Sequence, residues 1–154
     1  MKKLVLLALP ALVGMTAAAA ATEVTESIEI NAAPGKVWAA SAKDFCGIGQ
    51  FHPAVEKCAL SNEGKTRTLS LKGGGTIVEN QTAMKEGSSY SYVIVESPLP
   101  VSDYKSTFSI KGSGESSTVT WTGSFMPKGA DEATAKKAID GIYTSGLSAL
   151  KSKL

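Results

Sequence analysis

Apolar residues recur every three or four positions in the last segment, 130–154, and this spacing predicts a long amphipathic helix. The apolar stripe consists of Ala135, Ala138, Ile139, Ile142, Tyr143, Leu147 and Leu150. Asp131 and Glu132 stand at the start of the segment and Lys151 and Lys153 at its end, which is the order that the helix dipole favours. A helix with one apolar face must pack against a second layer.

Most of the chain before this helix alternates apolar and polar residues with a period of two, which predicts strands. A first strand is expected at 23–31, a short helix from Pro34, and a second short helix or tight loop at 44–51. Further strands are expected at 55–60, 67–71, 77–81, 90–96, 104–111 and 119–125. Short turns join them, so the expected fold is α+β, with an antiparallel meander covering the terminal helix.

The register of one hairpin follows from the length of its loop. A three-residue loop at 72–74 pairs Leu69 with Ile77 and Arg67 with Glu79. This register places an aliphatic pair and an oppositely charged pair on the same face of the sheet.

The face assigned to the interior mixes aromatic and aliphatic side chains with a few polar ones, as a ligand pocket does. It comprises Arg67, Leu69, Glu79, Gln81, Tyr92, Ile94, Tyr104, Phe108, Trp121 and Phe125. Two interpretations of Arg67 and Glu79 stay open. Either they form a buried pair with a function or a complete hydrogen-bond network, since burying an ion costs several kcal/mol, or they form a solvated bridge at the sheet margin worth under about 1 kcal/mol.

The N-terminus has the pattern of an export signal. Lys2 and Lys3 precede an apolar run at 4–13, and small residues follow up to Ala21. We expect cleavage near Ala21, with an uncleaved membrane anchor as the alternative. Residues 22–154 then form a single domain of 133 residues without stable membrane insertion.

Charge and cysteine content narrow the function classes further. Without its first 21 residues the chain has 14 basic and 14 acidic residues, so no basic surface for nucleic acid is expected. Cys46 and Cys58 are expected to form one disulfide in an oxidising compartment, worth about 2–3 kcal/mol, or else to be two buried thiols. One histidine and no Cys-x-x-Cys motif predict neither a metal site nor a cofactor.

Several short motifs carry a resemblance to a known family. They are Ala33-Pro34 to Trp38, Asp44-Phe45-Cys46-Gly47-Ile48-Gly49, His52-Pro53-Ala54-Val55, Arg67-Thr68-Leu69, Glu79, Tyr90-Ser91-Tyr92, Pro98-Leu99-Pro100-Val101 and Gly141-Ile142-Tyr143. The chain resembles the START-like, helix-grip superfamily, also called SRPBCC. Within it the chain is similar to small exported proteins of the polyketide cyclase/dehydrase and lipid-transport type, including periplasmic methanol-oxidation accessory proteins (MxaD type).

This resemblance implies a curved antiparallel sheet around a long C-terminal helix, two short helices after the first strand, and a cavity for a hydrophobic ligand. The candidate ligand-binding residues are Trp38, Phe45, His52, Arg67, Leu69, Glu79, Gln81, Tyr92, Ile94, Tyr104, Phe108, Trp121 and Tyr143. Gly146, on the apolar stripe, either lets the sheet approach the helix or leaves space for a ligand.

The expected function is that of a periplasmic protein that binds a small hydrophobic molecule. The resemblance also implies an accessory role in a periplasmic oxidation system, with a dehydrogenase or a cytochrome as partner. The alternative is a cyclase or dehydratase, whose candidate catalytic residues are His52 and Glu79. The sequence shows no Ser-His-Asp ordering and no metal-ligand cluster, and His52 also fits a purely structural place at the pocket mouth. Binding is therefore preferred to catalysis.

Overall fold

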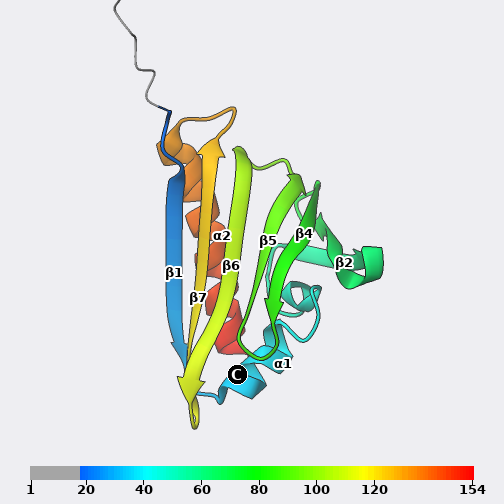
Figure 1. The fold of residues 1–154 in the computed structure, drawn as a ribbon, viewed down its shortest axis with the longest axis vertical. Helices are drawn as coiled ribbons and strands as arrows, with labels where there is room; N and C mark the ends of the chain where they lie inside the picture. The colour runs from blue at the N-terminus through cyan, green and yellow to red at the C-terminus, as the bar shows by residue number, and fades with distance from the viewer. Residues whose placement is uncertain (1–17) are drawn as a thin grey trace, which may run out of the picture.

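Residues 18–154, which the computed structural model describes, form one antiparallel sheet, two α-helices and two 3-10 helices (Figure 1). The strands are β1 (Thr22–Ile30), β2 (Val55–Ser61), β3 (Thr66–Leu71), β4 (Thr76–Lys85), β5 (Ser89–Glu96), β6 (Val101–Ser113) and β7 (Ser116–Pro127). The helices are α1 (Pro34–Ser41), η1 (Gly47–Gln50), η2 (Asn62–Gly64) and α2 (Glu132–Ser152). The signal peptide predicted for residues 1–21 falls mostly on residues 1–17, outside the described part.

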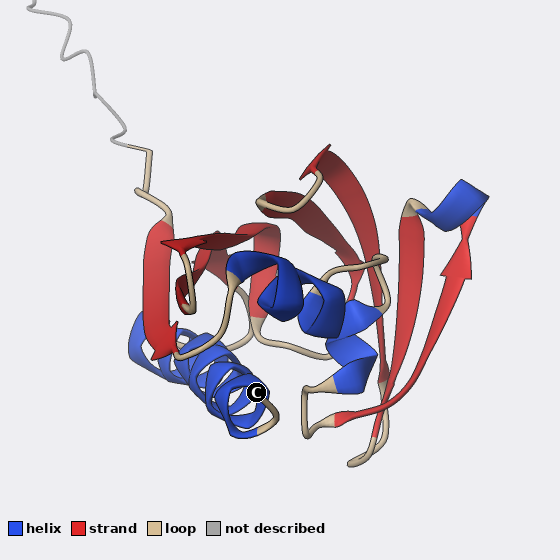
Figure 2. Ribbon diagram, turned by 90° about the horizontal axis from the view of Figure 1, so that it is seen from below, coloured by secondary structure: helices blue, strands red, loops and turns tan. Residues whose placement is uncertain are grey.

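The strand order β1-β7-β6-β5-β4-β3-β2 makes β1 and β2 the two edges of the sheet. Every neighbouring pair is antiparallel. The chain crosses from the β1 edge to the β2 edge through α1 and η1, which lie across one end of the sheet (Figure 2). From β2 onward each strand pairs with the next, so the predicted meander and the predicted fold class are confirmed.

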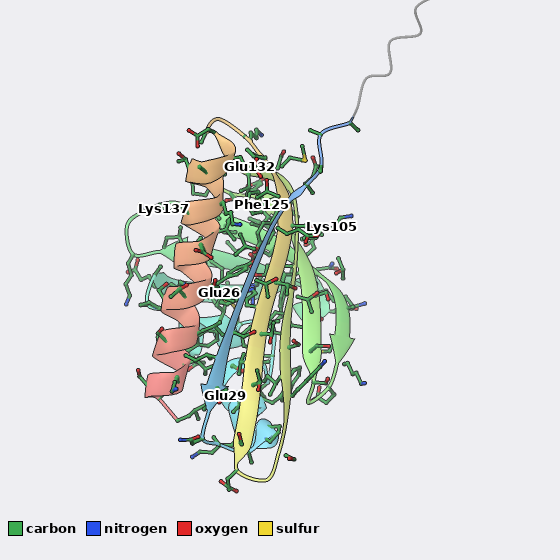
Figure 3. All side chains as sticks on the ribbon, turned by 90° about the vertical axis from the view of Figure 1, so that its left-hand side faces the viewer. Glu26, Glu29, Lys105, Phe125, Glu132 and Lys137 are labelled. Atoms are coloured by element: carbon green, nitrogen blue, oxygen red, sulfur yellow. A yellow bond between two sulfur atoms is a disulfide. The ribbon has the colours of Figure 1, made fainter. Side chains whose placement is uncertain are left out.

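The terminal helix α2 packs on the sheet through β1 and β7. Its buried residues include Ala135, Ile139, Tyr143, Leu147 and Leu150, all on the predicted stripe. The side chain of Asp131 caps the helix by accepting a hydrogen bond from the Thr134 amide at 2.7 Å. The hydroxyl of Thr22 donates to Glu132 at 2.9 Å, which ties the start of β1 to the start of α2 (Figure 3).

The segment between β1 and β2 is held by three local features. Pro34 occupies the first turn of α1, where its missing N–H costs no hydrogen bond. Gly47 has no room for a side chain, because a Cβ there would lie 2.2 Å from the Ser41 carbonyl oxygen. A disulfide joins Cys46 to Cys58, with the Cα atoms 5.6 Å apart, so the predicted bond is confirmed and η1 is tied to β2.

The predicted hairpin register is also confirmed. Leu69 pairs with Ile77 and Arg67 with Glu79 across β3 and β4. The Arg67 side chain is 0% exposed and that of Glu79 is 6% exposed. The alternative of a solvated bridge at the sheet margin is therefore wrong. In residues 18–154, no helix has both the length and the apolar character needed to cross a membrane.

Candidate ligand-binding site

An apolar cavity of about 200 Å³ lies between the inner face of the sheet and the helices. Strands β2 to β7, α2 and the segment around η1 all contribute to its wall. The lining residues are Ile48, His52, Ala54, Val55, Leu69, Leu71, Ile77, Glu79, Tyr92, Ile94, Leu99, Tyr104, Trp121, Ile139 and Ile142. Two thirds of them are aliphatic, so the wall favours an apolar occupant.

The structure brings seven of the thirteen predicted binding residues to this cavity. They are His52, Leu69, Glu79, Tyr92, Ile94, Tyr104 and Trp121. The other six do not line it: Trp38, Phe45, Arg67, Gln81, Phe108 and Tyr143. The role of these six in ligand binding stays a prediction.

The six lie in the surrounding layers. Arg67 bonds to Glu79 and to the Phe45 carbonyl, and Tyr143 stacks on Trp121 with the ring centroids 4.6 Å apart. Phe108 stacks on Tyr90 at 5.4 Å, Trp38 is buried on α1, and Gln81 is half-buried further along β4.

The Arg67–Glu79 pair is the most strongly charged feature next to the cavity. Arg67 Nε donates to Glu79 Oε2 at 2.5 Å, and Nη1 donates to the Phe45 carbonyl at 2.8 Å. The guanidinium carbon lies 4.2 Å from the Phe45 ring centroid and 4.7 Å from that of Tyr92, which adds cation–π attraction. Burial opposes the charge on Arg67, but the Glu79 carboxylate and the neighbouring tyrosines outweigh it and raise the pKa of Arg67 above its ordinary value.

A second polar cluster, here called the tyrosine network, consists of Tyr92, Tyr104, Ser106, Trp121 and Tyr143. The indole N–H of Trp121 donates to the Tyr92 hydroxyl at 3.0 Å and to Ser106 Oγ at 3.1 Å. The Tyr143 hydroxyl contacts Ser106 Oγ at 3.2 Å and also bonds to the Tyr104 hydroxyl. The hydroxyls of Tyr92 and Tyr104 are 3.5 Å apart.

The direction of each bond in the tyrosine network follows from counting protons. Ser106 donates its single proton to the Thr122 carbonyl at 2.6 Å, so Tyr143 must donate to Ser106. Tyr104 must then donate to Tyr143, and Tyr92 to Tyr104. Every hydroxyl proton in the network is used inside the protein.

All four tyrosines of the chain are buried near the cavity, and this burial disfavours the charged phenolate. Burial raises the pKa of Tyr90, of Tyr92 and of Tyr104, and it raises the pKa of Tyr143 to about 12. The four phenols therefore stay neutral far above the pH at which exposed tyrosines ionise.

His52 lies at the cavity wall with both ring nitrogens bonded to the backbone. Its Nε2 bonds to the Ile142 carbonyl on α2 at 3.0 Å, and its Nδ1 accepts from the Ala54 amide at 3.2 Å. A carbonyl accepts and an amide donates, so the ring is neutral with its proton on Nε2. Burial lowers the pKa of His52, and the nearby Arg67 charge lowers it further. Neither ring nitrogen is left to exchange a proton with a substrate.

Two glycines allow the helix and the sheet to meet beside the cavity. A Cβ at Gly146 would lie 2.7 Å from His52 Cδ2 and 3.0 Å from Trp121 Cζ3, so this glycine lets the rings approach α2. A Cβ at Gly123 would lie 2.1 Å from the Tyr143 hydroxyl oxygen, so this glycine makes room for the tyrosine network. Of the two interpretations of Gly146, close approach is the one that the structure supports.

A larger, open hollow of about 690 Å³ lies on the other face of the sheet, over β1 and β4 to β7. Its lining is rich in serine and threonine, and two of these hydroxyls, those of Ser91 and Thr107, bond to each other at 2.8 Å. This hollow is open to solvent, whereas the inner cavity has mostly aliphatic walls. The inner cavity is therefore the candidate site for an apolar ligand.

Eight lining residues were not among the predicted ones: Ile48, Ala54, Val55, Leu71, Ile77, Leu99, Ile139 and Ile142. All are small or aliphatic, and such residues look the same in a sequence whether they line a cavity or fill a core. The hairpin register was one signal that could have identified Ile77, because it places Ile77 opposite Leu69. Within residues 18–154 no group of three or more His, Cys, Asp or Glu side chains is placed to hold a metal ion.

A curved antiparallel sheet that grips a C-terminal helix around an apolar cavity defines the helix-grip, START-like class of α+β proteins. Within that class, the family model described as polyketide cyclase / dehydrase and lipid transport matches residues 21–154. The chain belongs to this family, which confirms the resemblance noted in the sequence. It matches none of the curated proteins with which it was compared.

Many solved structures are similar to this chain, among them the following three. The protein XoxI from Bacillus cereus shares 31% identity over 85% of this chain and 94% of its own, with a TM-score of 0.81. A START superfamily protein from Mycobacterium smegmatis shares 17% identity over 85% of this chain and 95% of its own, with a TM-score of 0.72. The Zhui aromatase/cyclase from Streptomyces sp. R1128 shares 15% identity over 86% of this chain and 93% of its own, with a TM-score of 0.70. The last two show the fold alone.

Proposed function

We propose that this protein binds a small hydrophobic molecule in the cavity between the sheet and α2. The observation that carries this proposal is the cavity of about 200 Å³, whose walls are mostly aliphatic. An engineered cavity of about 150 Å³ with such walls stays dry and binds benzene. Burying each CH₂ group of a ligand contributes about 0.8 kcal/mol.

The direct test is a binding titration with a compact apolar probe such as toluene, followed by NMR chemical-shift changes of the lining methyl groups. We expect saturable shifts of Ile77, Ile94 and Ile142. Native mass spectrometry of protein purified from its own host then identifies the resident molecule. Absence of saturable binding for every compact apolar probe contradicts the proposal.

A matched pair of variants separates the cavity from nonspecific surface binding. Leu71→Phe adds volume inside the cavity, whereas Leu60→Phe makes the same change at a side chain that is 42% exposed on the neighbouring strand β2. We expect Leu71→Phe to weaken toluene binding at least tenfold and Leu60→Phe to leave it unchanged. Equal effects of the two variants would place the bound probe elsewhere.

The alternative function, catalysis of the cyclase or dehydratase type, takes its support from the family description. We rank it second because His52 has both ring nitrogens engaged and Glu79 is held by Arg67. If the protein is such an enzyme, Glu79→Gln or His52→Ala lowers kcat for its substrate without unfolding the protein. Turnover that is unaltered in both variants excludes these two residues as catalysts.

We further propose that the protein is exported, is cleaved near Ala21, and works in the periplasm as the single domain 22–154. A disulfide is typical of an oxidising compartment. N-terminal sequencing of the protein from a periplasmic fraction tests the cleavage, and a mature chain that retains Lys2 contradicts it. The accessory role with a dehydrogenase or a cytochrome rests on the family resemblance. A crosslinking pull-down from periplasm that recovers neither partner reproducibly would count against that role.

A further inference from the structure

The polar groups that reach the cavity decide what kind of molecule fits it. Five lining side chains carry polar atoms: His52, Glu79, Tyr92, Tyr104 and Trp121. The ring nitrogens of His52 are both occupied by backbone partners. The protons of Tyr92, Tyr104 and Trp121 are all donated within the tyrosine network. Among the described residues, no lining side chain has a hydrogen-bond donor left for a ligand.

Glu79 is the exception among these groups, because it keeps one acceptor. Its Oε2 accepts from Arg67 Nε at 2.5 Å, while the other carboxylate oxygen, Oε1, has no hydrogen-bond partner among residues 18–154. The carboxylate forms part of the cavity wall. A carboxylate oxygen that faces an apolar cavity without a protein donor is incompletely solvated, so the cavity favours a molecule that supplies a donor.

Arg67 is not available to bind a ligand in the cavity. Its guanidinium does not line the cavity, and it packs against the rings of Phe45 and Tyr92 with its carbon 4.2 Å and 4.7 Å from their centroids. Its Nη1 points to the Phe45 carbonyl at 2.8 Å. An anionic ligand would therefore meet the negative partner of the pair and not the positive one.

From this arrangement we infer that the cavity selects a benzene-sized molecule with one hydrogen-bond donor, an alcohol, phenol or amine, directed at Glu79 Oε1, and that it rejects carboxylates. The inference rests on the proposed binding function and adds the chemical class of the ligand. The size follows from comparison with the 150 Å³ cavity that binds benzene.

Three probes of nearly equal size test the inference on the wild-type protein: benzyl alcohol, toluene and benzoate. We expect benzyl alcohol to bind about tenfold more tightly than toluene, in line with one hydrogen bond to a charged group. We expect no saturable binding of benzoate. The readout is the titration of methyl chemical shifts, supported by the fluorescence of Trp121 in a Trp38→Phe background.

The variant Glu79→Gln replaces the hydrogen-bond acceptor that faces the cavity with a donor. In Glu79→Gln the amide oxygen can accept from Arg67, which leaves the NH₂ group facing the cavity as a donor. We expect the preference for benzyl alcohol over toluene to fall to twofold or less and benzoate binding to become detectable. The matched control is Glu29→Gln on the exposed face of β1, which should keep the wild-type order of affinities.

The outcomes separate the two proposals. If toluene binds as tightly as benzyl alcohol, or if benzoate binds to the wild-type protein, the binding function stands and the inferred ligand class is wrong. If neither uncharged probe binds, both proposals fail. The wild-type series alone is decisive, so the test does not depend on Glu79→Gln being folded.

Discussion

Two buried polar clusters adjoin the cavity, and they differ in completeness. In the tyrosine network every hydroxyl has a partner and every proton has a fixed direction. In the Arg67–Glu79 pair, Arg67 Nη2 is buried without a partner, and Oε2 is the one Glu79 carboxylate oxygen with a hydrogen bond in the described part of the chain. A complete network rigidifies a core, whereas an incomplete one beside a cavity marks a site that something else can complete.

The location of the two clusters fits this difference. The tyrosine network connects β5, β6 and β7 to α2, in the half of the molecule where the helix packs on the sheet. The ion pair lies on β3 and β4, whose inner face helps to form the cavity wall. Both clusters therefore border the cavity, and the ion pair is the one that leaves a carboxylate oxygen there without a protein donor among residues 18–154.

The largest effect should come from removing the cation of the pair. Arg67→Met leaves Glu79 buried without a counter-charge, and we expect it to lower the free energy of unfolding by about 3–5 kcal/mol. Urea denaturation measures the loss. The double variant Arg67→Met/Glu79→Leu, with two apolar side chains, should recover most of it. A loss below about 1 kcal/mol in the single variant would mean that the pair is solvated.

Alkaline titration tests the completeness of the tyrosine network. Since burial raises the pKa of all four tyrosines, the folded state keeps protons that the unfolded chain releases near pH 10. Stability is therefore fully present below about pH 10 and is lost as the pH rises above it. For Tyr143 the shift to about 12 corresponds to about 3 kcal/mol.

We expect the phenolate absorbance at 295 nm to appear only together with unfolding, monitored by far-UV circular dichroism. Urea-unfolded protein is the control and should titrate near pH 10. Ionisation near pH 10 of a tyrosine in the folded Tyr90→Phe variant, whose three remaining tyrosines all belong to the tyrosine network, would contradict the complete network.

A double-mutant cycle tests the contact between Gly123 and Tyr143. Gly123→Ala places a methyl group against the Tyr143 hydroxyl and should cost about 1–3 kcal/mol. In a Tyr143→Phe background the hydroxyl is gone, so the same change should cost clearly less. Thermal denaturation of the four proteins measures the coupling. Additive effects would show that the two residues do not meet in solution.

The smallest effect concerns His52, the one histidine of the chain. His52→Gln removes a buried hydrogen-bonded ring and should cost about 1 kcal/mol at pH 7.5. Because burial lowers the pKa of His52, the unfolded chain takes up a proton before the folded protein does. Wild-type stability should therefore fall as the pH drops below about 6.5.

Unfolding midpoints between pH 7.5 and 5.5 measure this dependence, and the His52→Gln variant should lack it. A wild-type midpoint that is constant or rises on acidification would show that the histidine is accessible. That result would reopen a role for it in proton transfer.

The sequence by itself determined the elements and much of their local pairing. The period of two placed the strands, the three- and four-residue steps placed α2, and the loop at 72–74 fixed Arg67 opposite Glu79. These features depend on neighbours within one or two elements, where the geometry of the backbone leaves few alternatives. The disulfide was predicted from the number of cysteines and the expected compartment.

Only the tertiary structure decided which polar atoms are satisfied and which face the cavity. His52 meets the Ile142 carbonyl 90 residues away, and Tyr104 meets Tyr143 39 residues away. No periodic pattern in the sequence predicts either contact, because both depend on how far α2 lies from the sheet. Gly123 and Gly146 allow a close approach, because a Cβ at either position would collide with Tyr143 or with His52 and Trp121.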